Sequence, residues 1–109
     1  MKTLEEFVFE SQKEIPRKNL KDVKPNAYII DVRQVDEVNS TQLILNAVHI
    51  PRGKLEFVID QLEGISKESS IYLYCAAGIR SALAGMSLKK MGYKNVFNLG
   101  GFVDLLDNQ

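Results

Sequence analysis

The stretch from residue 71 to residue 91 leaves few folds open to this chain, because a buried strand there runs directly into a helix. Residues 71–74 (Ile-Tyr-Leu-Tyr) are apolar and carry no charge, which is typical of a strand covered on both faces. The small residues 76–78 (Ala-Ala-Gly) allow a tight turn, and apolar residues at helical spacing follow over 81–91. The strand therefore ends at a glycine-containing loop and a helix N-terminus.

The rest of the chain repeats this alternation of short strands and helices. Pro16 ends the first helix, and Gly64 and Gly92 suit the position just after a helix. Gly85, inside the helix, predicts close packing on the sheet. Such alternation predicts an α/β fold whose open, mostly parallel sheet has helices on both faces. The other expected elements are a helix at 3–15, a candidate edge strand at 20–23, strands at 27–30, 47–51 and 95–99, a helix at 55–64 and an amphipathic tail at 102–106.

Length and charge balance are those of one domain without a strong electric field. The 109 residues are 45% hydrophobic, enough for a single domain over residues 1–109 with its own core. Fourteen basic residues balance fourteen acidic ones, which argues against nucleic acid or an acidic membrane as a partner. Because acidic residues stand at 5, 6 and 10, we expect no signal peptide there, and no apolar run in the sequence is long enough to span a bilayer. We therefore expect a cytoplasmic protein.

Cys75 is the only cysteine and lies where the strand gives way to the helix. Unpaired N–H groups and the positive end of the helix dipole favour an anion there, such as a thiolate. A single cysteine excludes an internal disulfide and a Cys-x-x-Cys metal or dithiol site, so redox chemistry would need an outside partner. The alternative is a buried structural cysteine, which is a common role. The adjacent glycine, Arg80 and the strand-to-helix position together favour a nucleophile.

Two further polar positions each have two interpretations. Asp31 follows the strand at 27–30, at the sheet edge where α/β folds bind ligands. It is either a functional carboxylate or, as we favour, the cap of the following turn, with Arg33 paired to Glu37. His49 is the only histidine and is either a general base or a structural residue. Its apolar neighbours, and the lack of a carboxylate at a suitable spacing, favour the structural role.

Three motifs occur in order along the chain. They are Asp31-Val32-Arg33 with Glu37, residues 47–56 (Ala-Val-His-Ile-Pro-Arg-Gly-Lys-Leu-Glu), and residues 75–81 (Cys-Ala-Ala-Gly-Ile-Arg-Ser) followed by Gly92-Tyr93 and by 99–102. Together they resemble the single-domain rhodaneses, and the resemblance extends over residues 27–102. The third motif, Cys-x-x-Gly-x-Arg-Ser, is the most specific of them. The tryptophan that usually follows the family's Gly-Gly turn is absent here.

The resemblance implies a three-layer rhodanese-like domain that works as a sulfurtransferase without metal or cofactor. Cys75 would take a sulfane sulfur from thiosulfate or a polysulfide and hold it as a persulfide. Cyanide or a thiol would then remove it, and thioredoxin and glutathione are candidate acceptors. Arg80 either binds the donor anion or holds the loop through carbonyls or Glu37, and Ser81 caps the helix and donates to the sulfur. The implied site comprises the catalytic Cys75, the substrate-binding Ala76, Ala77, Gly78, Ile79, Arg80 and Ser81, and the supporting Asp31, Arg33 and Glu37.

Two other functions compete with this interpretation. Cysteine phosphatases and arsenate reductases also place a cysteine and an arginine around an anion-binding loop, and some are similar to rhodaneses in fold. Their signature has five residues between the two, whereas four separate Cys75 from Arg80. A non-catalytic binding module is the second alternative, because folds outlast their chemistry. The presence of Cys75 argues against it.

Overall fold

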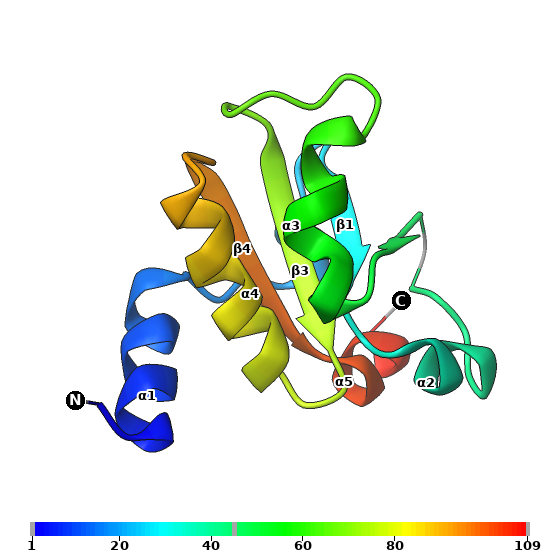
Figure 1. Ribbon diagram of the computed structural model, residues 1–109. Helices are drawn as coiled ribbons and strands as arrows, with labels where there is room; N and C mark the ends of the chain where they lie inside the picture. Colours follow the sequence, from blue (N-terminus) through cyan, green and yellow to red (C-terminus); the bar gives the residue numbers. More distant parts are fainter. Residues whose placement is uncertain (1, 45, 109) are drawn as a thin grey trace.

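A four-stranded sheet forms the centre of the computed structural model, which describes residues 2–44 and 46–108 (Figure 1). The strands lie in the order β2-β1-β3-β4, and each neighbouring pair is parallel. The predicted parallel α/β fold is confirmed, although the ends of the domain expected over 1–109 lie outside the described residues. The strands are β1 (Tyr28–Asp31), β2 (Val48–His49), β3 (Ser70–Cys75) and β4 (Asn95–Gly101).

One face of the sheet is covered by α3 and α4, with α1 packed beside α4 (Figure 1). Because side chains alternate between faces along a strand, Ile71, Leu73 and Cys75 of β3 point to the same side. They belong to a buried apolar cluster with Leu55 of α3 and Leu88 of α4. The elements on this side are α1 (Leu4–Glu14), the 3-10 turn η2 (Arg52–Lys54), α3 (Leu55–Val58), the 3-10 turn η3 (Ile59–Gln61) and α4 (Ile79–Lys90).

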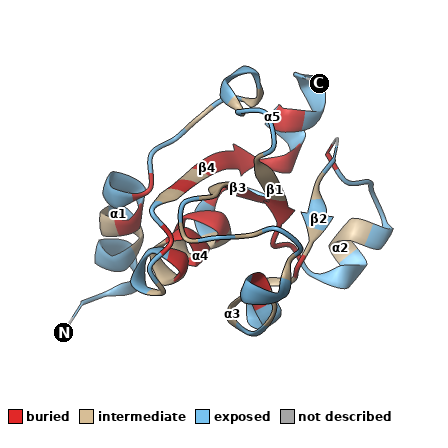
Figure 2. Ribbon diagram, turned by 90° about the horizontal axis from the view of Figure 1, so that it is seen from above, coloured by how far each residue is buried: buried red, intermediate tan, exposed pale blue. Residues whose placement is uncertain are grey.

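The opposite face is covered mainly by α5 (Phe102–Asp107) and the 3-10 turn η1 (Leu20–Asp22). Tyr72 and Tyr74 of β3 point to this side and pack with Phe102 and Leu105 in a second buried cluster. Figure 2 shows buried residues on the strands and on the surfaces of α4 and α5 that adjoin them. The short helix α2 (Val35–Asn39) follows the carboxyl end of β1. The sheet therefore lies between two helical layers, as predicted. Within the described part of the chain, no helix has the length and apolarity that a membrane crossing requires.

Two elements differ from the sequence expectation. The edge strand at 20–23 is wrong, because the chain there forms η1, in which the Asp22 N–H donates to the Asn19 carbonyl at 2.9 Å. The connector pairs with β4 three residues earlier instead, where Arg17 forms a parallel bridge with Asn98. The helix expected over 55–64 is divided into α3 and η3, although Gly64 has the left-handed φ of +76° that suits a residue after a helix.

Gly85 packs closely, and the atoms nearest to the position of an added Cβ belong to Ile15 at the end of α1. A Cβ atom at Gly85 would lie 2.9 Å from the Ile15 Cγ2 atom, closer than carbon atoms pack. The absence of a side chain on α4 therefore makes room for Ile15, which is almost fully buried. This contact fixes the position where the chain leaves α1 and turns towards β4.

Candidate active site

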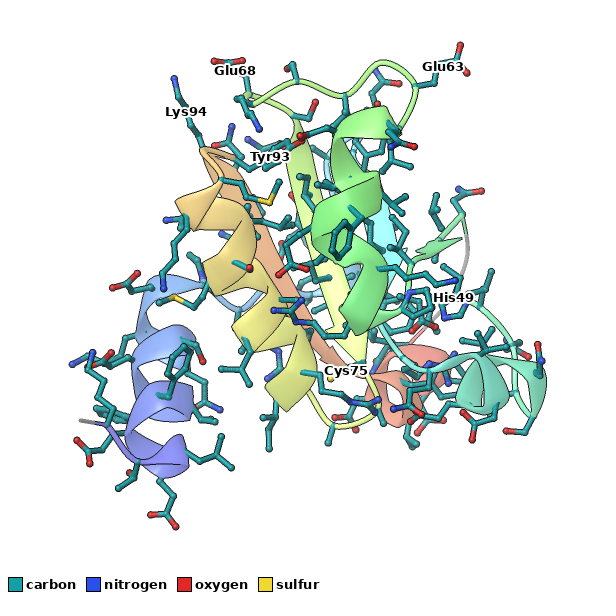
Figure 3. All side chains as sticks on the ribbon, viewed as in Figure 1. His49, Glu63, Glu68, Cys75, Tyr93 and Lys94 are labelled. Atoms are coloured by element: carbon teal, nitrogen blue, oxygen red, sulfur yellow. The ribbon has the colours of Figure 1, made fainter. Side chains whose placement is uncertain are left out.

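The Cys75 loop, residues 75–81, joins the end of β3 to the start of α4 (Figure 3). Gly78 is the residue before the helix and has a left-handed φ of +95°. The backbone angle favours glycine, and the space is tight as well, because a Cβ atom at this position would lie 3.3 Å from the Gly100 Cα atom. The loop thus turns sharply enough for its N–H groups to reach back to the end of the strand.

The residue Cys75 is 1% exposed, and its sulfur lies inside this turn. It accepts the Gly78 N–H at an N–S distance of 3.0 Å and the Ser81 N–H at 3.4 Å. The Ser81 hydroxyl oxygen is a further 3.4 Å neighbour. Two backbone donors at the amino end of a twelve-residue helix favour negative charge on this sulfur.

Arg80 is held by Glu37 of α2. Its Nη1 and Nη2 atoms donate to the two carboxylate oxygens at 2.6 and 2.9 Å. The hydrogen bonds from Arg80, and next the backbone N–H of Gln34, lower the pKa of Glu37 from 4.5 to about 2. The expected Arg33–Glu37 pair is therefore wrong. Of the roles open to Arg80, this geometry is that of a brace between α2 and the Cys75 loop.

Asp31 and Arg33 form a buried ion pair with each other. The Arg33 Nη2 and Nε atoms lie 2.7 and 2.9 Å from the Asp31 Oδ2 atom, and the Arg33 backbone N–H donates to Oδ1 at 2.8 Å. Asp31 thus caps the turn, as expected. The same guanidinium donates to the Thr41 hydroxyl and lies 4.0 Å from the centre of the Phe102 ring. These contacts join the end of β1 to α5 and to the segment that follows α2. Glu37 lies in α2 itself.

His49 makes a structural contact in β2. Its Nε2 atom lies 2.7 Å from the Arg33 carbonyl oxygen. Because a carbonyl only accepts, Nε2 carries the proton and donates it. The His49 ring joins β2 to the turn after β1. In Figure 3 the His49 and Cys75 labels lie apart, and Cys75 lies at the end of β3.

Sequence analysis missed Asn98, which reaches the Cys75 loop from β4. Its side chain is hydrogen-bonded to Gly78 and to Ser81, although it lies 17 residues beyond Ser81 in the sequence. Asn98 is 5% exposed, and asparagine is seldom that deeply buried. The available signal was an asparagine in the middle of the apolar strand expected at 95–99.

The geometry as a whole can stabilise an anionic sulfur. It combines one buried thiol, two backbone N–H donors, a helix N-terminus and a guanidinium whose charge is largely balanced by a carboxylate. No three His, Cys, Asp or Glu side chains among the described residues are placed to hold a metal ion. The nucleophile in displacement at sulfur is a thiolate, and backbone N–H donors such as those of Gly78 and Ser81 stabilise one.

Among proteins of known sequence, the chain is similar to a putative sulfur carrier protein, YrkF, of Bacillus subtilis. The two are 37% identical over 71 residues, which make up 65% of this chain and 36% of the relative. The chain therefore corresponds to about a third of that longer protein.

Two solved structures are similar over nearly the whole chain. A protein of unknown function from Rhodopseudomonas palustris, described as a possible tyrosine phosphatase, superposes with a TM-score of 0.83 at 27% identity, over 99% of this chain and 92% of that one. The polysulfide-sulfur transferase of Wolinella succinogenes, a homodimer, superposes with a TM-score of 0.75 at 29% identity, over 93% and 80%.

The family comparison agrees with the motifs and with the fold. The Rhodanese-like domain family matches residues 13–108, from the end of α1 to the end of α5. The match contains the whole sheet and the Cys75 loop. This chain belongs to the rhodanese-like domain family.

Proposed function

We propose that this protein is a sulfurtransferase that carries a sulfane sulfur on Cys75. The observation that carries the proposal is the Cys75 sulfur, which lies in a turn where the Gly78 and Ser81 N–H groups both point at it. A buried structural cysteine needs no such donors, whereas a thiolate and a persulfide do. The kinship with a putative sulfur carrier protein and a polysulfide-sulfur transferase supports the same chemistry.

The reaction has two displacement steps at sulfur. The Cys75 thiolate attacks the outer sulfur of thiosulfate, the sulfur–sulfur bond of the donor breaks, and sulfite leaves with the bonding electron pair. With a polysulfide donor, the shortened polysulfide chain leaves instead. Cyanide or a thiol then attacks the outer sulfur of the persulfide and expels the Cys75 thiolate, which the Gly78 and Ser81 N–H groups stabilise.

The surrounding residues divide the remaining work. We expect the backbone of residues 76–81 to surround the added sulfur, and Arg80 to hold the loop on Glu37. The acceptor is a small nucleophile or a thiol, with glutathione and thioredoxin as candidates. This chemistry needs neither nucleic acid nor a membrane as a partner. We propose that the protein acts in the cytoplasm.

The test is the mass of the intact protein after exposure to thiosulfate or to a polysulfide. We expect the wild type to gain one sulfur atom and to lose it on addition of cyanide, with thiocyanate as the product. Because Cys75 is the only cysteine, Cys75→Ser should gain none and should show no turnover. Sulfur uptake that persists in Cys75→Ser would contradict the proposal. No uptake from either donor by the folded wild type would favour a binding module.

A phosphatase is the second candidate, because the Rhodopseudomonas palustris structure is described as a possible tyrosine phosphatase. Two features of this chain argue against that activity. Four residues separate Cys75 from Arg80, one fewer than in the phosphatase loop, and Arg80 is already bonded to Glu37 through both terminal nitrogens. We therefore expect no Cys75-dependent hydrolysis of aryl phosphates. Hydrolysis by the wild type at a rate similar to its sulfur transfer, absent in Cys75→Ser, would favour the phosphatase.

A further inference from the structure

Asn98 makes three side-chain hydrogen bonds from β4 to groups around the Cys75 loop. Its Oδ1 atom accepts the Gly100 N–H at 2.9 Å and the Ser81 hydroxyl at 2.7 Å. Its Nδ2 atom donates to the Gly78 carbonyl oxygen at 3.0 Å. The asparagine therefore contacts the two loop residues whose N–H groups point at the Cys75 sulfur.

The two backbone partners fix the orientation of the Asn98 amide. A backbone N–H such as that of Gly100 only donates, and a backbone carbonyl such as that of Gly78 only accepts. A flipped amide would place its nitrogen against the Gly100 N–H and its oxygen against the Gly78 carbonyl, which loses both bonds. The oxygen of Asn98 must therefore face Ser81, and the Ser81 hydroxyl must be the donor in that contact.

This orientation determines which group holds the Ser81 proton. A serine hydroxyl has one proton, and the proton of Ser81 is directed at Asn98 at 2.7 Å. The Ser81 oxygen then presents only lone pairs to the Cys75 sulfur at 3.4 Å. It can accept from the thiol, but it cannot stabilise the thiolate unless its hydroxyl breaks the bond to Asn98.

We propose that Asn98 is a positioning residue that sets the proton arrangement around Cys75. It holds the Ser81 proton away from the sulfur, so that the N–H groups of Gly78 and Ser81 stabilise the thiolate and the hydroxyl does not. Through Nδ2 it also holds the Gly78 peptide, whose carbonyl points at Asn98. A role for this arrangement in sulfur transfer rests on the proposed function, whereas the arrangement itself does not. It replaces the sequence expectation that the Ser81 hydroxyl donates to the sulfur.

The charged groups around the loop do not change in the test variants. They are Arg80 of α4 with Glu37 of α2, the buried Asp31–Arg33 pair that follows β1, and Arg17, whose guanidinium covers Gly100. Substituting Ser81 or Asn98 by alanine removes none of these charges. A difference among the variants is therefore not caused by a lost charge, and comparing Ser81→Ala in the two backgrounds isolates the hydroxyl from the other bonds of Asn98.

The experiment is a double-mutant cycle on Ser81→Ala and Asn98→Ala. The ratio of thiolate to thiol is measured at one fixed pH from the ultraviolet absorbance of the thiolate, with Cys75→Ser as the blank. In the wild-type background, Ser81→Ala should leave the ratio within about threefold, because the hydroxyl that it removes does not donate to the sulfur. In the Asn98→Ala background, the freed hydroxyl does donate, so adding Ser81→Ala should lower the ratio about tenfold.

The proposal is overturned if Ser81→Ala lowers the ratio equally in both backgrounds, or lowers it about tenfold in the wild-type background. If Asn98→Ala does not fold, the thiolate-to-thiol ratio is compared between Ser81→Ala and Ser81→Thr, which retains the hydroxyl. A tenfold loss in the first that the second restores would overturn the proposal, and equal ratios in both would support it. The ratio is measured without a sulfur donor, so a wild type that forms no persulfide would contradict the proposed function and leave this result standing.

Discussion

Replacing Glu37 by glutamine tests whether its ion pair with Arg80 braces the Cys75 loop. The fall in the pKa of Glu37 from 4.5 to about 2 sets an upper bound on how much the ionised carboxylate stabilises the folded protein. At about 1.4 kcal/mol per pH unit, that fall corresponds to about 3.5 kcal/mol of stabilisation of the folded protein. The side chains of Arg80 and Glu37 are 36% and 32% exposed, so solvent screens the pair. We therefore expect Glu37→Gln to lower the free energy of unfolding at pH 7 by about 1–2 kcal/mol.

The pH dependence separates this ion pair from a loss of packing. The pKa of Glu37 is lower in the folded protein than in the unfolded chain, so the pair stabilises the fold above pH 4.5. This stabilisation is lost as the pH falls towards about 2, where the wild-type carboxylate becomes protonated. Other carboxylates titrate in both proteins, so the difference between wild type and variant isolates Glu37.

The assay is urea unfolding of wild type and Glu37→Gln at neutral pH and at several points between pH 4.5 and the acid limit of the fold. Glu63→Gln is the matched control, because Glu63 is exposed and has no ion-pair partner among the described residues. We expect the Glu37→Gln difference to shrink with acid and the control to show none. A difference that is absent at neutral pH, or that stays constant as the pH falls below 4.5, would refute the brace.

Three further substitutions test the packing around the site. Gly101→Ala would place a Cβ atom 2.8 Å from the Ala76 carbonyl oxygen. Since the φ of −97° suits alanine, the loop must move, and we expect at least about a tenfold loss of sulfur transfer in a folded protein. Gly85→Ala should lower the melting temperature, because the crowding of Ile15 costs about 1–3 kcal/mol and the gain in helix propensity is only about 1 kcal/mol. In an Ile15→Ala background the crowding is removed, so the same substitution should raise the melting temperature. His49→Gln should cost about 1 kcal/mol in urea unfolding and keep sulfur transfer within about tenfold, since its contact is structural.

The sequence was sufficient for the strand, the turn and the helix around Cys75, because each depends on neighbouring residues. The apolar run of β3 and the glycine at the left-handed position are local signals, and the structure agrees with both. The pairing of Arg33 with Glu37 failed for an equally local reason. A four-residue spacing brings side chains together on a helix, but α2 begins only at Val35. Arg33 therefore turns back to Asp31, and Glu37 is left to reach Arg80, 43 residues away.

Asn98 escaped sequence analysis because its position depends on an irregular pairing of β3 with β4. Leu73 pairs with Asn98, but the next residue, Tyr74, pairs with Gly100, so one residue of β4 is passed over. Gly100 has a left-handed φ of +94°, which permits this irregularity. A regular strand pattern does not reveal such a shift. The shift keeps Asn98 beneath Ser81 while the Gly100 N–H turns back to its side chain.

The Cys75 loop owes its shape to other parts of the fold, because Ala76, Ala77 and Gly78 have no polar side chains of their own. Asn98 of β4 is hydrogen-bonded to the loop at Gly78, and Gly101 leaves space for the Ala76 carbonyl. Glu37 of α2 holds Arg80. A persulfide lengthens the cysteine side chain by one sulfur atom, and Ala76, Ala77 and Gly78 have no polar side chains that could turn towards that atom. The proposed sulfur transfer therefore requires that the N–H groups of the loop are in place before the sulfur arrives, which is electrostatic preorganisation. Contacts from β4 and α2 supply that rigidity, which three small residues alone could not.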